Sequence, residues 1–341
     1  HSGPCRHLAT RQAARKGAAN RLGHGVPITS FPPETKDLAM TTLQRWTLAA
    51  VCAATAVLML DIAVVNTALS TIAVDLDTDL HGLQWVVDAY TLALATVVLS
   101  AGSLADRMGR RKLFIGGLAL FTVSSVACAA APTIEVLIGA RAVQGIGAAV
   151  MFAVSLALLA QAFPGAQERA KALAAYGATI GASFAVGPLV GGALTTGLGW
   201  RWVFLINVPI GVACLAVAVT RVRESRDPRA RKLDVPGQIT LTGGLFLLVF
   251  ALLRGNEEGW GSPMIVGLLA GAAVLLVAFV IVELQSLRPM VPMGLFRSPA
   301  FAGAQVAAFA ISASFFAVFL YTTLYLQQVL GLTAVEAGLV Y

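Results

Sequence analysis

Two charged residues lie inside apolar stretches of this sequence. Asp61 stands in the run from Leu60 to Ser70, and Arg141 stands in a later apolar run. A charge at the centre of a membrane-spanning helix costs about 2.5–3.5 kcal/mol on insertion scales, so by default it faces a cavity or a partner. A carboxylate can also take up and release a proton. Asp61 is therefore a candidate for proton binding, whereas Arg141 either lines a cavity or forms a buried structural ion pair.

Other polar residues accompany these two charges. Helical spacing places Gln144, Gly145 and Ala148 on the same face as Arg141, which predicts a polar head beside a groove of small residues. Asn66 follows Asp61 within the same apolar run.

A third charged residue, Asp88, stands near the start of another apolar run. It lies between Trp85 and Tyr90, which suit the aromatic belt at a membrane–water interface. Asp88 either faces a cavity, where its charge would favour a cationic ligand, or extends outward to water. The residues leave both possibilities open.

The elements that must position these side chains are membrane spans. Hydrophobic residues make up 57% of the chain and charged residues only 12%, about half the charged share of a soluble domain. A span needs about 20 apolar residues, and nine runs qualify: 46–70, 84–105, 112–131, 134–162, 171–197, 202–220, 237–253, 264–284 and 301–328. The sequence therefore predicts an all-α polytopic membrane protein.

The basic residues between these runs alternate by side. With the amino terminus inside, outer loops hold only Arg201 and Arg254. The inner loops hold Arg107, Arg110, Arg111, Lys112, Arg169, Lys171, Arg221, Arg223, Arg226, Arg229, Arg231, Lys232, Arg288 and Arg297. This positive-inside bias supports the span count and a cytoplasmic amino terminus. It also assigns the net charge of +7 to topology, so we expect no nucleic-acid partner.

Several classes of protein are disfavoured by what the sequence lacks. The four cysteines form no CxxC pair, which argues against a disulfide framework or a metal site. The sequence contains no GxxxxGK[ST] loop for an ATP-driven pump and no HExxH or GxSxG motif of an enzyme. We expect no enzyme activity and no cofactor.

The chain divides by composition into five parts. Residues 1–43 are expected to be a disordered or non-native extension, because 1–39 hold no apolar run and Met40 is a possible start. Residues 44–220 form a bundle of six spans, 221–236 a basic cytoplasmic linker and 237–284 two additional spans. Residues 285–341 would begin a second bundle that is truncated here.

The loop after the second apolar run contains both glycines and charged residues. This loop runs from Gly102 to Lys112, where the glycines are expected to allow a tight turn and Asp106 to cap a helix or pair with a base. The segment closely resembles the cytoplasmic-loop signature of the major facilitator superfamily. The resemblance implies a cytoplasmic gate formed by Gly102, Asp106, Arg107, Gly109, Arg110 and Arg111.

The fifth run carries a stripe of small residues around a proline. Gly177, Gly181, Ala185, Pro188 and Gly192 are predicted to line one bent packing face. The run resembles the antiporter motif of drug exporters, although Ser183 replaces the favoured glycine. The resemblance implies a moving hinge made of Gly181, Gly187, Pro188, Gly191 and Gly192.

The first run resembles the corresponding motif of the fourteen-span drug:proton antiporters within this superfamily, with Ser70 in place of a proline. The likeness covers about residues 44–338 and implies a major facilitator fold. It also implies proton coupling by Asp61 and Arg141, and a substrate site or outer gate at Asp88, Asn66, Tyr90 and Gln144.

The implied function is proton-driven export of a lipophilic or cationic drug by a monomer in the bacterial cytoplasmic membrane. The partners are the drug, protons and membrane lipid. A proton-coupled metabolite symporter and a non-transporting truncated membrane protein are the alternatives.

Overall fold

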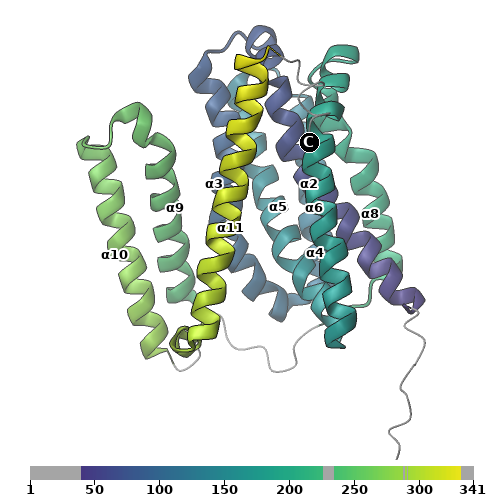
Figure 1. Cartoon of the computed structure of the whole chain (residues 1–341), viewed down its shortest axis with the longest axis vertical. Helices are drawn as coiled ribbons and strands as arrows, with labels where there is room; N and C mark the ends of the chain where they lie inside the picture. The colour runs from purple at the N-terminus through teal and green to yellow at the C-terminus, as the bar shows by residue number, and fades with distance from the viewer. Residues whose placement is uncertain (1–39, 226–233, 287–288, 290, 332–341) are drawn as a thin grey trace, which may run out of the picture. The chain divides into compact units, whose positions relative to one another are not determined.

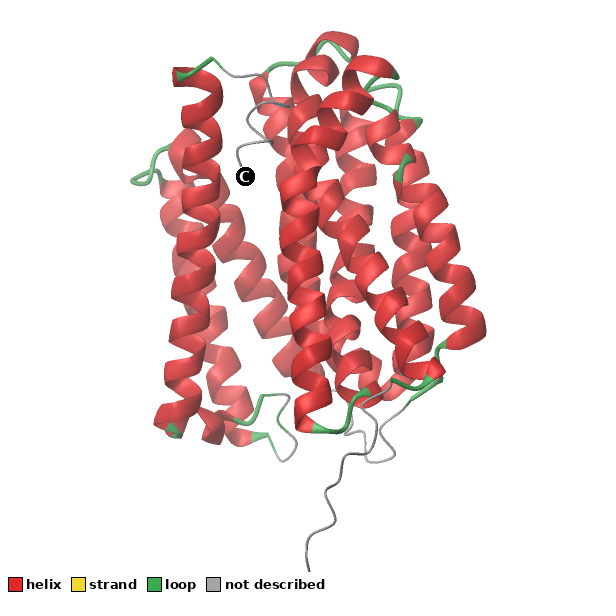
Figure 2. Ribbon diagram, turned by 45° about the vertical axis from the view of Figure 1, so that its right-hand side comes forward, coloured by secondary structure: helices red, strands yellow, loops and turns green. Residues whose placement is uncertain are grey.

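The computed structural model describes residues 40–225, 234–286, 289 and 291–331, and every regular element within these ranges is a helix (Figure 2). The elements are α2 (Thr42–Asp75), α3 (Leu80–Met108), α4 (Arg110–Ala129), α5 (Ile134–Ala162), α6 (Ala166–Gly197), α7 (Trp202–Leu205), α8 (Asn207–Arg221), α9 (Val235–Glu258), α10 (Pro263–Gln285), η1 (Met293–Arg297), α11 (Pro299–Leu324) and η2 (Tyr325–Val329). The expected extension before Met40, most of the basic linker and Arg288 lie outside the described residues.

The predicted spans correspond closely to these helices. Among the described residues, eight helical segments are long and apolar enough to cross a membrane, with α7 and α8 together forming the sixth. The ninth predicted span, 301–328, coincides with α11, where several side chains are outside the description. The all-α prediction is confirmed.

The helices extend beyond the apolar runs that predicted them because polar caps lie outside the apolar core. At the start of α2, Thr41 accepts a hydrogen bond from the Gln44 amide, and the Gln44 side chain accepts one from the Thr41 amide. Asp79 caps α3 through the Gly82 amide, and Asp234 caps α9 through the Gly237 amide. Such caps satisfy amide groups that have no partner within the helix.

Small residues let the helices of the first bundle approach closely. At Gly145 in α5 a Cβ atom would lie 2.4 Å from the carbonyl oxygen of Tyr90 in α3, and at Gly187 in α6 it would lie 2.3 Å from the Cβ of Ala63 in α2. Only glycine fits these contacts, which draw α5 onto α3 and α6 onto α2. The small-residue groove predicted beside Arg141 is therefore present.

The small-residue stripe predicted on the fifth run is only partly correct. Pro188 and Gly192 are buried, but Gly177 and Gly181 are exposed, with no atom within 4 Å of a built Cβ. The face that packs on α2 instead follows the helical phase of Phe184, Gly187, Pro188 and Gly191. Gly181 therefore lies outside this contact.

The two additional helices, α9 and α10, pack on each other, and α9 lies along α3 (Figure 1). Hydroxyl oxygens of Ser100 and Thr242 lie 3.0 Å apart, and the Gln238 amide donates to the Ser103 hydroxyl. Near the other end, the rings of Trp85 and Phe250 lie 5.8 Å apart. The contact is thus polar at one end of α3 and aromatic at the other.

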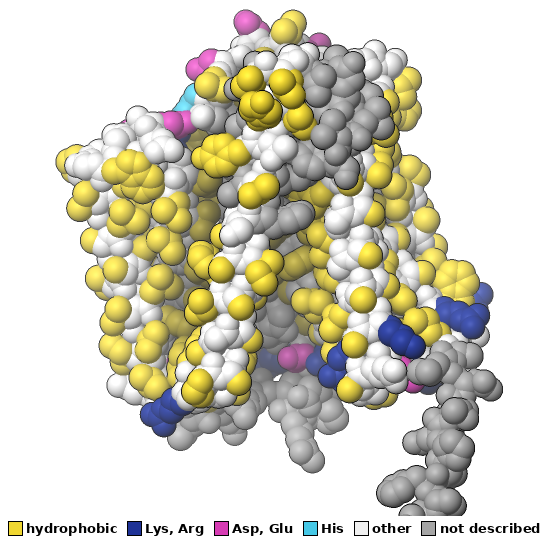
Figure 3. Space-filling model, in the orientation of Figure 1, with side chains coloured by type: hydrophobic (Ala, Val, Ile, Leu, Met, Phe, Trp, Pro, Cys, Tyr) yellow, Lys and Arg dark blue, Asp and Glu magenta, His cyan; other side chains and the backbone are white. Residues whose placement is uncertain are grey.

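Basic and acidic side chains of the described residues gather at opposite ends of the helices. On the face drawn in Figure 3, Lys and Arg side chains gather at the end where α2 begins, and Asp and Glu lie mainly at the opposite end. This distribution has the form that the alternation of basic loops predicts.

Candidate functional site

The carboxylate of Asp61 is completely enclosed at the centre of the first bundle. Its side chain is 0% exposed, and Oδ2 accepts a hydrogen bond from Nη1 of Arg141 at 2.6 Å. Oδ1 accepts from Nε2 of Gln144 at 3.0 Å and from Nδ2 of Asn207 at 2.7 Å. Three donors from two other helices therefore hold this single carboxylate.

Arg141 is held on several sides. Its side chain is 2% exposed, Nε donates to the carbonyl of Val86 in α3 at 3.1 Å, and Nη1 also donates to Oε1 of Gln144 at 2.7 Å. The guanidinium carbon lies 4.1 Å from the centre of the Tyr90 ring and 5.8 Å from that of Phe204. Aromatic faces attract a cation, so the rings add to the stabilisation from Asp61.

Ser125 completes this arrangement, which we call the central cluster: Asp61, Ser125, Arg141, Gln144 and Asn207. The Ser125 hydroxyl accepts from Nε2 of Gln144 at 2.9 Å and lies 3.5 Å from Nδ2 of Asn207. The cluster members come from α2, α4, α5 and α8, and Val86 adds α3. A change in the charge of Asp61 would therefore act on five helices at once.

Asp61 and Arg141, which the sequence marks as two separate candidates, thus form one ion pair. A buried pair is strongly coupled, because loss of either partner leaves the other charge without compensation in a low-dielectric interior. Two further polar atoms, Oη of Tyr90 and Oδ1 of Asn207, are buried and have no hydrogen-bond partner among the described residues.

Tyr90 does not lie in an interfacial belt, contrary to the prediction from the sequence. Its side chain is fully buried beneath Arg141, because it lies on the face of α3 that packs against α5. Trp85 is half-buried, with its ring 5.8 Å from that of Phe250 in α9.

Asn66 does not join the central cluster. It is exposed, and its Nδ2 donates to the carbonyl of Ile62 one turn earlier in α2, at 3.0 Å. Asn66 and Asp61 are five residues apart, so they point to different sides of the helix.

Asp88 lies on the side of α3 that faces α9. It is half-buried and within electrostatic range of Glu257 and Arg254. Arg254 also forms ion pairs with Glu257 and Glu258 and lies 3.1 Å from the ring nitrogen of His81. No basic residue stands beside Asp88 in its own apolar run, and the packing of α9 on α3 supplies Arg254.

The loop signature forms a joint between α3 and α4. Asp106 accepts from Arg110 at 2.8 Å, as the sequence suggested, while Gly109, with φ of +106°, is the one residue between the two helices. Gly102 was expected in the turn, but it lies inside α3 with open space beside it. Arg107 lies in the last turn of α3.

The joint is also tied to the end of α8. The Glu224 carboxylate accepts from the backbone amides of Arg111 and Lys112, each at 3.2 Å, and so caps α4. In return, Nε of Arg111 donates to the carbonyl of Ala218 in the last turn of α8, at 3.1 Å. Opposite charges at these helix ends stabilise both helices.

Three of these residues were not predicted from the sequence. Ser125 and Asn207 are short polar side chains in apolar runs. Only the packing of α8 against α2, and of α4 against α5 and α8, brings them into the central cluster. A signal was available for Asn207, which stands in an apolar stretch just before Pro209. Glu224 gave no such signal because it lies in a charged segment.

Comparison with known proteins places this geometry in context. The chain is 39% identical over 303 residues to the multidrug resistance protein Stp of Mycobacterium tuberculosis, covering 88% of this chain and 56% of that protein. It is 38% identical over 280 residues to the methylenomycin A resistance protein of Streptomyces coelicolor, covering 82% and 59%. It is 38% identical over 315 residues to the puromycin resistance protein pur8 of Streptomyces alboniger, covering 92% and 62%.

The chain thus spans about 56–62% of the length of these relatives. The family model of the Major Facilitator Superfamily matches residues 51–341, which includes the central cluster, the joint and the α9–α10 pair. The chain belongs to the Major Facilitator Superfamily.

Proposed function

We propose that this chain forms part of a proton-coupled antiporter that exports drugs or antibiotics across the bacterial cytoplasmic membrane. The observation that carries the proposal is the buried ion pair between Asp61 and Arg141, linked by hydrogen bonds to three more helical positions, Val86, Gln144 and Asn207. Relatives at 35–39% identity bear the names of multidrug, methylenomycin A and puromycin resistance proteins, which supports a drug as the exported substrate.

The central cluster suits proton coupling for a physical reason. Protonation of Asp61 would remove the negative charge that compensates Arg141, and an uncompensated charge in an apolar interior is costly. The helices carrying Arg141, Gln144 and Asn207 would then favour a different arrangement. Uptake of a proton on one side of the membrane and its release on the other would thereby be linked to movement of the bundle, with no cofactor besides the proton gradient.

The roles that we propose for the α3–α4 joint and for the α6–α2 contact follow from their positions in the bundle. The joint of Asp106, Gly109 and Arg110 would serve as the cytoplasmic gate, since a change at α3 reaches α8 through Arg111 and Glu224. The close contact of Gly187 and Gly191 with α2 would act as the hinge. We assign Gln144 to the coupling site along with Asp61.

We also propose the fourteen-span branch and a cytoplasmic amino terminus. In the sequence, the helical pair α9–α10 comes between the six-span bundle and α11, as the two additional spans of that branch would. In the structure, α9 packs on α3. The gathering of basic side chains at the end where α2 begins supports the orientation (Figure 3).

Transport in everted vesicles tests the proposal. Vesicles from cells that express the complete reading frame encoding this chain would be given an inside-acid pH gradient and a fluorescent lipophilic cation. An antiporter accumulates the dye inside, and collapse of the gradient releases it. Release of a preloaded metabolite from the lumen together with the outward proton flow would support the symporter alternative, and no gradient-dependent movement would contradict the proposal.

A further inference from the structure

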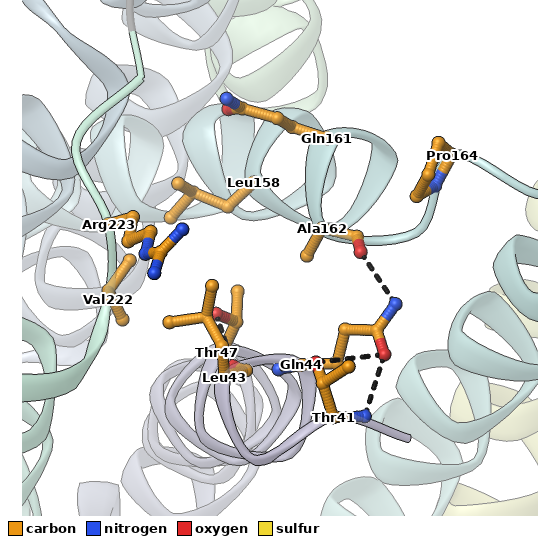
Figure 4. Close-up of a pocket in the computed structure, with 10 residues that line it drawn as sticks. All are labelled: Thr41, Leu43, Gln44, Thr47, Leu158, Gln161, Ala162, Pro164, Val222 and Arg223. Atoms are coloured by element: carbon orange, nitrogen blue, oxygen red, sulfur yellow. Dashed lines mark hydrogen bonds between the residues drawn. The ribbon is translucent and has the colours of Figure 1, made fainter. Parts of the chain in front are cut away.

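A pocket opens where three helices of the first bundle end or begin. None of the residues that line it belongs to the central cluster. It has a volume of about 330 Å³ and lies between the start of α2, the end of α5 and the segment after α8 (Figure 4). This volume is at the lower end of the range of about 300–1,000 Å³ typical of small-molecule sites. The pocket therefore suits a compact group better than a whole drug.

The lining of this pocket is amphipathic. Leu43, Leu158 and Val222 supply apolar walls, while Thr47 and Gln161 supply polar atoms. Figure 4 shows these side chains arranged around one open space, with the guanidinium of Arg223 pointing into it.

Arg223 gives the pocket its charge. It forms no hydrogen bond, ion pair or ring contact with another described residue. Its neighbour Glu224 forms no ion pair with it, and the Glu224 carboxylate instead accepts hydrogen bonds from the α4 backbone amides of Arg111 and Lys112. One acidic residue, Glu168, lies at the rim, where it is 3.5 Å from the Gln44 side chain. The open space is thus faced by a cation that has no ion-pair partner among the residues that the structure describes.

The depth of the pocket in the membrane can be inferred from its neighbours. Trp46 follows the pocket residue Gln44 by two positions, is 39% exposed and lies 5.6 Å beneath the guanidinium of Arg221. A partly exposed tryptophan beside an arginine at a helix end is typical of the headgroup region. The same helix end carries the basic side chains of the first bundle (Figure 3), and basic clusters at this level attract anionic lipids.

We propose that this pocket binds the phosphate-bearing headgroup of an anionic phospholipid, with Arg223 as its charged contact. The acyl chains would leave along the apolar wall, and the headgroup would join the first turn of α2 to the last turn of α5 and the segment after α8. The site is separate from the proposed transport chemistry and does not depend on it.

Native mass spectrometry of the purified 341-residue chain tests the proposal. In detergent with equal amounts of phosphatidylglycerol and phosphatidylcholine, the chain should retain phosphatidylglycerol preferentially. Arg223→Gln should lower that retention about fivefold, since one basic residue near an anionic surface contributes about this factor. The matched control is Arg297→Gln, which removes an equal charge from an inner loop outside the pocket and should change retention less than twofold.

A second variant separates the pocket from surface charge. Ala162→Leu fills part of the space without altering any charge and should also lower phosphatidylglycerol retention. Inorganic phosphate at millimolar concentration should not displace the lipid. Equal losses with Arg223→Gln and Arg297→Gln, no loss with either pocket variant, or displacement by inorganic phosphate would each overturn the lipid site. The last result would identify a soluble anion as the occupant.

Discussion

Two arginine–aspartate pairs in this molecule have the same length and different surroundings. Arg141 and Asp61 lie 2.6 Å apart at the centre of the bundle, and Arg201 and Asp75 lie 2.6 Å apart at the end of α2. The central side chains are 2% and 0% exposed, and the peripheral ones are 43% and 45% exposed. The distance between the charges therefore does not predict how much each pair contributes to stability, because burial sets the free-energy cost of breaking it.

The surroundings differ in kind as well as in exposure. Asp75 also accepts a hydrogen bond from the Trp200 indole at 2.8 Å, but water can replace either donor. Around Asp61, by contrast, Gln144 and Asn207 complete the hydrogen bonding of a carboxylate with no exposed surface. The peripheral pair can stabilise a turn, whereas the central pair can respond to a proton.

Removal of Arg141 should have the largest effect on stability. Arg141→Leu leaves the Asp61 carboxylate buried without its cation and should lower the free energy of unfolding by about 3–5 kcal/mol. The double variant Asp61→Leu/Arg141→Leu should recover most of this loss. Reversible unfolding in mixed micelles of sodium dodecyl sulfate measures both. A double variant as unstable as the single one would show that the pair is not coupled.

A side chain at Gly187 should have the next largest effect. Gly187→Val forces atoms into the contact with Ala63 of α2 and should cost about 1–3 kcal/mol through overpacking. The matched control is Gly181→Val in the same helix, where the space beside the glycine is open. Thermal unfolding in detergent should separate the two variants. Equal destabilisation would contradict the assignment of the packing face to Gly187.

Loss of the cap between Glu224 and α4 should have a moderate effect. Glu224→Gln removes the negative charge from the α4 amino terminus and should cost about 1 kcal/mol. Glu258→Gln, which breaks an exposed pair with Arg254 inside α9, should cost less, about 0.3–0.5 kcal/mol. The unfolding midpoints of the two variants provide the comparison, and a larger effect at Glu258 would refute the cap.

The peripheral pair should give the smallest effect. Arg201→Leu makes the same change as Arg141→Leu but exposes Asp75 to water and should cost less than about 1 kcal/mol. Measured under the same conditions, the two arginine variants isolate the contribution of burial. A loss at Arg201 that matches the loss at Arg141 would remove the contrast between the two pairs.

The fold was predictable because span lengths and charge alternation depend on local composition. All nine predicted apolar runs overlap helices, and the errors are confined to polar ends such as Thr41 and Asp79, which extend helices through capping. The phase of the α6 packing face was not predictable from small residues alone. Both Gly181 and Gly187 are small, and only the position of α2 distinguishes them.

The site was predictable where a residue is anomalous by itself. Asp61 and Arg141 stand out because a charge in an apolar run requires an explanation. Their pairing, and the contribution of Ser125 and Asn207, depend on contacts between helices far apart in sequence. The surroundings of Asp88 were not predictable for the same reason. Its charged neighbours belong to α9 and come near it only because α9 packs on α3.

The central claim is that Asp61 couples proton movement to export, and Asp61→Asn tests it most directly. In the complete reading frame, asparagine keeps the size of the side chain but cannot release a proton. Everted vesicles with matched amounts of folded, inserted protein would be energised by a pH gradient and assayed for accumulation of a lipophilic cation. The account predicts that gradient-driven accumulation is abolished in Asp61→Asn, with substrate binding retained. Accumulation at the unaltered rate would contradict it.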